Sequence, residues 1–436
     1  MISLEKDNIG KLFLKYTIPS VMGMVVASIY VIVDGIFIGN KIGSSGLAAI
    51  TISLPYISFI IALSLLLTVG GGTLTNIYLG KKEKEKASGI FSMTIIALFL
   101  LSIVVTALSL AFLGKIVYFL GASDLLYNYV WDYLFYSIIF TFAYMIFYIL
   151  DMGVKGTGNP GYSMKVIIFT SILNIILDYI FIFPLDLGMK GAALASGISH
   201  SIGTMILALY FIFINKDLKF KFIKIDLLLI IRMMKNGFSE FVNSSSSGIT
   251  ILLFNIILMN SYGEDGVAAY SIIGYATAFI IAVFFGISEG VLPIISYNYG
   301  ANQIIRVKNT LFLSLKTVFY LGLSVTLFTL ISPELLVRFF IKDNQDLLTF
   351  SGYAIRIFSL SFLFNGFNIM ISAFFTAIEE AKKSAFISVL RSLILVIVGI
   401  FILPKIIGDS GIWFVIPFAE VITFIYCIYL LRNQRE

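Results

Sequence analysis

Twelve long apolar stretches, separated by short polar connectors, dominate this 436-residue chain. Each stretch is long enough to cross the roughly 30 Å hydrocarbon core of a bilayer as a helix. Helices are the expected form, because open strands leave backbone groups without hydrogen-bond partners in lipid. We predict membrane spans near residues 14–38, 49–74, 89–113, 128–153, 164–183, 190–214, 230–260, 268–292, 308–331, 352–377, 384–403 and 411–431.

The composition excludes a soluble protein and most enzyme classes. Charged residues make up 12% of the chain and hydrophobic residues 59%, whereas about a quarter of a soluble domain is charged. The single cysteine excludes a disulfide framework, and the single histidine excludes a multi-histidine metal site. The chain carries no glycine-rich phosphate loop and no nucleophile with a paired base. We therefore expect a membrane protein that is not an enzyme.

Basic residues alternate between the two sides of the predicted bundle. With twelve spans, 23 of the 30 Lys and Arg residues lie on the side of the two termini, among them the KKEKEK stretch at 81–86. Lys and Arg concentrate in the cytoplasmic loops of membrane proteins. We therefore expect a multi-pass protein of the cytoplasmic (inner) membrane with both termini in the cytoplasm.

An internal repeat divides the chain into two halves. A shift of 220 residues superposes Gly43, Gly46, Ala48, Ala49, Gly70, Gly80, Gly188 and Gly191 on Gly263, Gly266, Ala268, Ala269, Gly290, Gly300, Gly408 and Gly411. Because each half contains six spans, both halves insert with the same orientation, as in one class of secondary transporter. We predict an all-α membrane protein with two parallel six-helix lobes, related by a pseudo-two-fold axis along the membrane normal. The expected N-lobe covers residues 1–214, the cytoplasmic connector 215–229 and the C-lobe 230–436.

Asn174 and Asp178 lie four residues apart inside the apolar run 166–183, on one face of the predicted helix. A carboxylate in a bilayer costs about 2.5 kcal/mol or more, so Asp178 must face protein, water or a cation. This cost makes Asp178 a candidate functional residue, although a packing pair with Asn174 remains an alternative.

Several motifs together resemble the multidrug and toxic compound extrusion (MATE) family, in its bacterial multidrug-efflux branch. They cover both halves of the chain: Val33–Gly39 (VDGIFIG), Gly156–Pro160 (GTGNP), Asn174–Phe183 (NIILDYIFIF), Gly188–Ser196 (GMKGAALAS), Gly266–Ser271 (GVAAYS) and Pro293–Ala301 (PIISYNYGA).

The resemblance implies a cation-coupled antiporter that expels organic, often cationic compounds. Asp34 and Asp178 match the two N-lobe carboxylates of the family, Asn174 matches the neighbouring amide, and Ser196 replaces a frequent Thr. Their oxygen atoms suit H⁺ or Na⁺ as the coupling ion, so Asp34, Asn174 and Asp178 form the candidate Na⁺ site, and we expect no other cofactor. By helix rise Asp34 lies about 28 Å beyond Lys15, past the membrane midplane.

Two further acids are candidates for contact with a cationic substrate. Glu240 begins the seventh span, where an ion pair with Lys235 or Arg232 is the alternative, and Glu289 lies well inside the eighth, where a packing role is the alternative. Other residues that could line a cavity are Tyr136, Met145, Tyr148, Phe254, Tyr275 and Phe279.

Other charged residues are expected to be paired. Asp151 and Lys155 are spaced for an i,i+4 ion pair at the membrane rim. Arg391 should pair with an acid or extend to the membrane surface. The tenth span has no acid between Ile357 and Ile378, which argues against a C-lobe cation site of the kind some relatives carry.

Two other functions fit a bundle of this size. A flippase for a lipid-linked saccharide precursor would line its cavity with basic residues to hold a pyrophosphate, whereas the predicted spans place acids inside. An ion channel would not need two parallel lobes. We therefore expect small organic cations and membrane lipids as partners, no nucleic acid, and a monomer.

Overall fold

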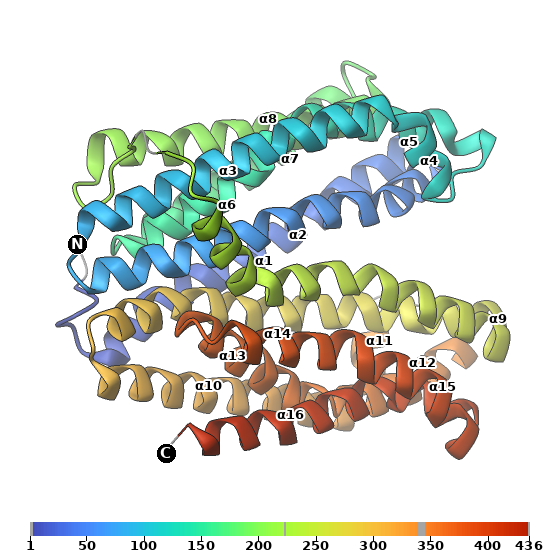
Figure 1. Cartoon of the computed structure of the whole chain (residues 1–436). Helices are drawn as coiled ribbons and strands as arrows, with labels where there is room; N and C mark the ends of the chain where they lie inside the picture. Colours follow the sequence, from blue (N-terminus) through green and yellow to red (C-terminus); the bar gives the residue numbers. More distant parts are fainter. Residues whose placement is uncertain (1–2, 222–223, 339–344, 435–436) are drawn as a thin grey trace.

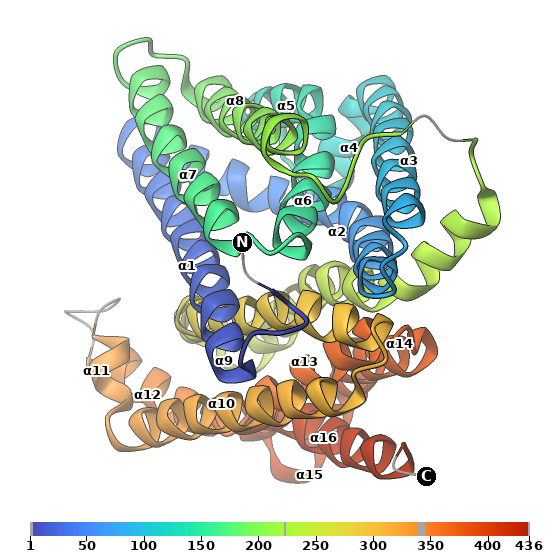
Figure 2. The same ribbon diagram turned by 90° about the vertical axis from the view of Figure 1, so that its left-hand side faces the viewer.

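The computed structural model describes residues 3–221, 224–338 and 345–434, and these ranges are built from helices without a strand. Two lobes follow each other in sequence and lie side by side, α1 to α8 in one and α9 to α16 in the other (Figure 1, Figure 2). Both chain termini lie at the same end of the bundle (Figure 1). We call this the terminal end and the opposite one the distal end.

The N-lobe contains eight α-helices, of which α4 is a short helix at the distal end (Figure 1). Their bounds are α1 Ile9–Ile42, α2 Ser44–Gly80, α3 Lys84–Ala111, α4 Leu113–Phe119, α5 Asp124–Ile139, α6 Thr141–Gly156, α7 Pro160–Ile182 and α8 Gly188–Leu209, which continues as the π-helix η1 Tyr210–Ile214.

The C-lobe begins with α9, Leu227–Gly300, which is two spans joined at a non-helical residue, Gly263. The remaining elements are α10 Ile304–Ile331, α11 Pro333–Val337, α12 Gln345–Ser359, α13 Phe362–Ala377, α14 Ala381–Val389, η2 Leu390–Ile394, α15 Leu395–Ile407, η3 Asp409–Phe414 and α16 Val415–Asn433.

The number of spans agrees with the sequence prediction. Within the described residues, 10 helices are long and apolar enough to cross a membrane, with α9 counted as two. Two further helix pairs qualify together, α5 with α6 and α12 with α13, and they are bent by 51° and 43°. Counting each bent pair as one span gives 12. The fourth and tenth predicted spans are therefore kinked, which the sequence analysis did not predict.

The two kinks have the same local cause. At the first, the Thr141 hydroxyl donates to the Ile138 carbonyl at 2.7 Å, and at the second the Ser361 hydroxyl donates to the Phe358 carbonyl at 2.7 Å. A hydroxyl that bonds to the preceding turn competes with the backbone ladder and bends a helix. A threonine of a neighbouring helix also donates at each kink, Thr106 to the same Ile138 carbonyl at 3.3 Å and Thr326 to the Ser359 carbonyl at 3.1 Å. The repeat therefore extends to the hydrogen bonds of the kinks.

Glycine also fixes the turns that the repeat places at the distal end. Gly43 (φ 80°, ψ −157°), Gly263 (φ 65°, ψ −149°) and Gly408 (φ 77°, ψ −169°) adopt a backbone conformation that is essentially restricted to glycine. A Cβ at Gly43 or Gly263 would have open space around it. These two glycines are required by their backbone angles and not by crowding.

Glycines of a different kind join the lobes at the terminal end, where α2 packs against α9. A Cβ on Gly80 would lie 2.0 Å from the Tyr297 carbonyl oxygen, and one on Gly300 would lie 2.0 Å from the Ile77 carbonyl oxygen. The two contacts exchange under the 220-residue shift, so they are related by the pseudo-two-fold axis. Gly70 approaches the Met233 carbonyl in the same way. Backbone therefore meets backbone across the lobes.

We expect Gly43→Ala and Gly263→Ala each to lower the free energy of unfolding by about 1–3 kcal/mol, because alanine is strained at these angles. Gly248→Ala is the control, since Gly248 lies inside α9 with open space and should gain about 0.5–1 kcal/mol. Unfolding in mixed detergent micelles measures all three. Equal effects at Gly43 and Gly248 would contradict the conformational argument.

Candidate functional site

Two buried carboxylates face each other from neighbouring helices of the N-lobe. α1 carries Asp34 and packs along α7, which carries Asp178 (Figure 2). Asp34 is 8% exposed, Asp178 is fully buried, and the two interact electrostatically. In each, Oδ1 is buried without a hydrogen-bond partner among the described residues. Neither carboxylate is therefore neutralised by a basic side chain of the chain described here.

Asn174 and Ser196 join this pair through the second carboxylate. In the amide orientation that satisfies its neighbours, Asn174 donates to Asp178 Oδ2 at 3.2 Å and accepts from the Ser196 hydroxyl at 3.1 Å. Ser196 comes from α8, so three helices build the cluster. The structure thus brings together the four residues that the sequence analysis assigned to ion coupling.

Three tyrosines that the sequence analysis missed surround the two carboxylates. Tyr30, Tyr133 and Tyr144 each interact electrostatically with both Asp34 and Asp178. Tyr30 lies one helical turn before Asp34, so its spacing was a usable signal. The other two come from α5 and α6, and no local pattern links them to the pair.

This cluster suits a proton or a small hard cation. Carboxylate, amide and hydroxyl oxygens are the ligands that hard cations prefer, and the unpartnered carboxylate oxygens leave acceptor capacity for one. Within the described residues, no group of three or more His, Cys, Asp or Glu side chains gathers as a transition-metal site. The fit is therefore to a monovalent ion or to a proton that the two carboxylates share.

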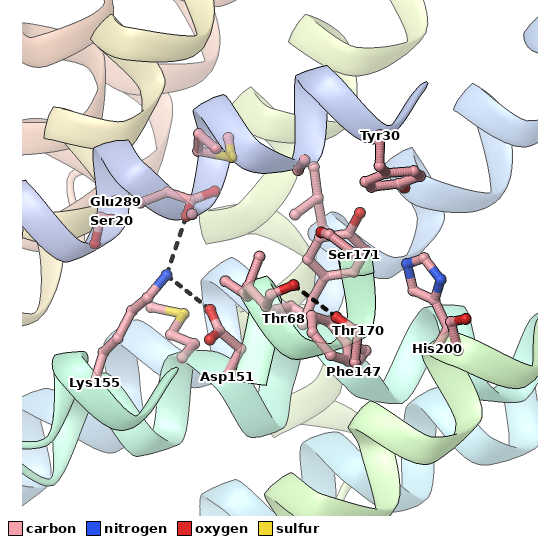
Figure 3. A pocket seen from close by; sticks show the side chains of 18 of the residues that line it. Ser20, Tyr30, Thr68, Phe147, Asp151, Lys155, Thr170, Ser171, His200 and Glu289 are labelled. Carbon is pink, nitrogen blue, oxygen red and sulfur yellow. Dashed lines mark hydrogen bonds and ion pairs between the residues drawn. The ribbon is translucent and has the colours of Figure 1, made fainter. Parts of the chain in front are cut away.

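A cavity of about 150 Å³ lies in the N-lobe (Figure 3), and two residues of this cluster, Tyr30 and Asn174, line it. It is large enough for several water molecules. Helices α1, α2, α6, α7 and α8 form most of its wall, and Asn174 and His200 line the part near the ion cluster. Among the described residues of the C-lobe, only Glu289 and Leu292 line it, both from α9. The cavity thus connects the ion cluster to the boundary between the lobes.

A charged triad lies along the wall of this cavity. The Lys155 ammonium lies 2.7 Å from Asp151 and 3.2 Å from Glu289, as Figure 3 shows. The predicted ion pair of Asp151 and Lys155 is present in the last turns of α6, and protein encloses it, because the Lys155 side chain is only 5% exposed. Tyr16 of α1 and Ser163 of α7 cover it.

The candidate substrate contacts divide into two groups. Glu289 and Tyr148 line the cavity. Glu240 lies half-buried in α9, where it interacts with Asn243 and Glu289, and its alternative partner Arg232 binds Glu379 instead.

Four of the other candidates, Tyr136, Met145, Phe254 and Phe279, are not among the described residues that line the cavity. Met145 and Phe254 are fully buried core residues, Phe279 is 49% exposed, and Tyr136 packs edge-on against Phe135. The side chain of Tyr275 lies outside the described residues. In helices that are apolar all round, periodicity does not distinguish a cavity wall from the core or the lipid face.

The C-lobe holds an ion pair where the N-lobe has its cavity. Arg391 binds Glu420 at 2.7 Å, and Asn365 and Asn368 donate to the same carboxylate at 2.9 and 2.7 Å. The expected pairing of Arg391 with an acid is confirmed. Under the 220-residue shift, Arg391 corresponds to Ser171 and Glu420 to His200, which both line the cavity. The sequence analysis missed Glu420, although an acid inside the last apolar stretch was a visible signal.

Comparison with known proteins identifies the family. The family model described as MatE matches residues 19–180 and again residues 241–402. The chain belongs to the MatE family. The two matches cover most of the chain and fall once in each lobe, in agreement with the repeat.

Relatives of this MatE-family chain match it over nearly its full length. It is 28% identical over 438 residues to the multidrug export protein MepA of Staphylococcus haemolyticus, covering 99% of this chain and 95% of the relative. It is also 28% identical over 439 residues to MepA of Staphylococcus aureus, covering 99% and 96%.

Solved structures share the fold. A MATE structure in the straight conformation superposes with a TM-score of 0.92 at 22% identity, covering 99% of this chain and 97% of the other. An outward-facing multidrug resistance MATE family transporter of the MOP superfamily gives a TM-score of 0.92 at 22% identity, with the same coverage. At this identity the likeness establishes the fold alone.

Two buried aspartates of this MatE-family chain should respond in opposite ways to the same substitution. Asp178→Asn removes the desolvation cost of a buried carboxyl group and its repulsion with Asp34, and should raise the free energy of unfolding by about 1–2 kcal/mol. Asp151→Asn removes one of the two carboxylates that pair with the buried Lys155 and leaves Glu289 as the other, so it should lower the free energy of unfolding by about 1–3 kcal/mol. Thermal unfolding in detergent at pH 8 without Na⁺ measures both. A loss of stability in both variants would contradict the assignment of Asp178 as an unneutralised group.

Proposed function

We propose that this chain exports organic, often cationic compounds by antiport against H⁺ or Na⁺, through alternating access between its two lobes. The observation that carries the proposal is the pair of buried carboxylates, Asp34 and Asp178, with unpartnered oxygens beside a cavity. Such groups are costly in a membrane, and they persist where an ion binds and leaves. Membership of the MatE family and the multidrug export relatives support the cargo class.

Each part of the ion site has a defined role in this proposal. Asp34 and Asp178 bind the ion, Asn174 orients the second carboxylate and Ser196 orients Asn174. Because the ligands come from α1, α7 and α8, binding and release of one ion change the attraction between these helices. Asn174 also lines the cavity, so this change reaches the wall that a cargo would contact.

Alternating access fits the contacts between the lobes. The close backbone contacts of Gly70, Gly80 and Gly300 join the lobes at the terminal end. With both termini in the cytoplasm, as the distribution of basic residues favours, this arrangement is closed toward the cytoplasm. Separation of the lobes at these glycines would give the opposite state. The proposed protein acts as a monomer surrounded by lipid, with residues 215–229 as the connector between the lobes.

The lipid-linked saccharide flippase has less support. Lys155 is the one Lys or Arg among the described residues that line the cavity, and two carboxylates neutralise it. A pyrophosphate would need free basic side chains.

Transport in inside-out vesicles tests the proposal. A fluorescent organic cation should accumulate when a proton gradient or a Na⁺ gradient is applied, and the gradient that works identifies the coupling ion. Asp34→Asn and Asp178→Asn should each reduce gradient-driven uptake by about tenfold or more, because the ion then has no charged ligand pair.

Asp186→Asn is the matched control. Asp186 lies in the connector between α7 and α8, its side chain is exposed, and it pairs with Lys41 at the end of α1. This variant should transport as the native chain does. No uptake by the native chain under either gradient would favour the flippase, and undiminished coupling in both carboxylate variants would exclude this ion site.

A further inference from the structure

The Lys155 ammonium is shared between the two lobes. Its first partner, Asp151 at 2.7 Å, lies on the same helix α6, and its second, Glu289 at 3.2 Å, lies on α9 of the C-lobe (Figure 3). The Lys155 side chain is 5% exposed, whereas that of Glu289 is 39% exposed and lines the cavity. The buried Lys155 ammonium therefore pairs with two carboxylates, Asp151 on its own helix and the more exposed Glu289 on α9.

The contacts of Lys155 within its own lobe are the more extensive. The Ser163 hydroxyl donates to the other oxygen of Asp151, and the Tyr16 hydroxyl donates to the Lys155 backbone carbonyl at 2.9 Å. All of these residues belong to the N-lobe and would move together. The contact between Lys155 and Glu289 is therefore the part of the triad that separation of the lobes must break.

The position of Glu289 depends on close contact between the lobes. A Cβ on its neighbour Gly290 would lie 2.9 Å from the Tyr16 carbonyl oxygen and 2.9 Å from the Thr17 Cα. α9 therefore touches the α1 backbone directly beside the triad. When α9 moves away from α1 at this point, Glu289 moves away from Lys155.

Separation of the two lobes leaves the charges of the triad unequally neutralised. Asp151 and Lys155 remain as a neutral pair, whereas Glu289 is left as a single carboxylate facing the cavity. A lone carboxylate at this depth is costly and attracts a cation. Glu240 of the same lobe interacts electrostatically with Glu289 and with Arg391, and Arg391 is paired with Glu420. Among the described residues that line the cavity, the C-lobe supplies one acid, Glu289, and no Lys or Arg.

We propose that the organic cation cargo binds at Glu289 in exchange for Lys155, so that Lys155 acts as a tethered competitor of the cargo. This inference rests on the proposed function and adds the residue that recognises the cargo and the event that exposes it. In the closed arrangement Lys155 occupies Glu289. In the separated arrangement one positive charge of the cargo replaces it. The lobes close again around Lys155 only after the cargo has left.

Equilibrium binding of tetraphenylphosphonium without any ion gradient tests the exchange. Glu289→Gln keeps the side-chain shape and leaves Lys155 neutralised by Asp151, so the variant should fold. We expect it to bind tetraphenylphosphonium about tenfold more weakly or worse, because the cation loses its carboxylate. Lys155→Gln removes the competitor and should strengthen binding. Glu334→Gln, an exposed acid on α11 of the same lobe, should bind as the native chain does.

Distances between spin labels test whether cargo binding is coupled to separation of the lobes. Lys165→Cys and Lys308→Cys place labels on exposed helix starts, one in each lobe, and Cys427→Ala removes the buried native cysteine. In native background, tetraphenylphosphonium should shift the distribution toward longer distances. In Glu289→Gln, the longer distance should be populated already without ligand, because the contact between the lobes is lost.

Native-like binding together with a native-like distance distribution in Glu289→Gln would overturn the proposal, and so would unchanged or weaker binding in Lys155→Gln. Because both assays omit ion gradients, they remain informative if gradient-driven transport fails. A failure of ion coupling at Asp34 and Asp178 is thus distinguishable from a failure of the exchange at Glu289.

Discussion

Buried charge in a medium without water is the constraint on which this structure depends. A charged side chain inside the hydrocarbon region needs a partner, and the chain meets this need in three ways. Arg391 and Glu420 neutralise each other in the C-lobe, and Lys155 serves Asp151 and Glu289 where the lobes meet. Asp34 and Asp178 keep oxygens without a partner in the described chain. This third arrangement distinguishes the candidate ion site from the charged pairs that are neutralised within the protein.

The two lobes have the same backbone fold but differ in the polar side chains of their interiors. Turns at Gly43 and Gly263, and the hydroxyl bonds of Thr141 and Ser361 at the kinks, repeat at the same offset. The side chains that point into each lobe do not repeat. Where the N-lobe has a mostly apolar cavity with a few polar and charged side chains in its wall, the C-lobe has an internal ion pair with two asparagines. Among the described residues, the candidate ion ligands are therefore concentrated in the N-lobe, and the C-lobe contributes Glu289 and Leu292 to the cavity.

Much of the fold and of the ion site was predictable from the sequence. Span length, the constant glycine offset and the isolated polar residues Asp34, Asn174 and Asp178 are signals within single helices. The rest depends on contacts between distant segments. The ion pair of Lys155 with Glu289 joins residues 134 positions apart across the lobes, and no spacing rule predicts it. The kinks occur without proline or glycine nearby, so no residue type announced them. The core positions of Met145 and Phe254 were not predicted, because apolar helix faces look alike in sequence.

The glycine contacts between α2 and α9 have a consequence for how such a protein can vary. Where Gly80 meets the Tyr297 carbonyl and Gly300 meets the Ile77 carbonyl, no side chain takes part in the contact, and none can be added. Selection for a new range of exported compounds can remodel the cavity wall residue by residue. It has no such freedom at these two positions. Drug-selected variants should therefore accumulate around the cavity, while Gly80 and Gly300 stay unchanged across the lineage.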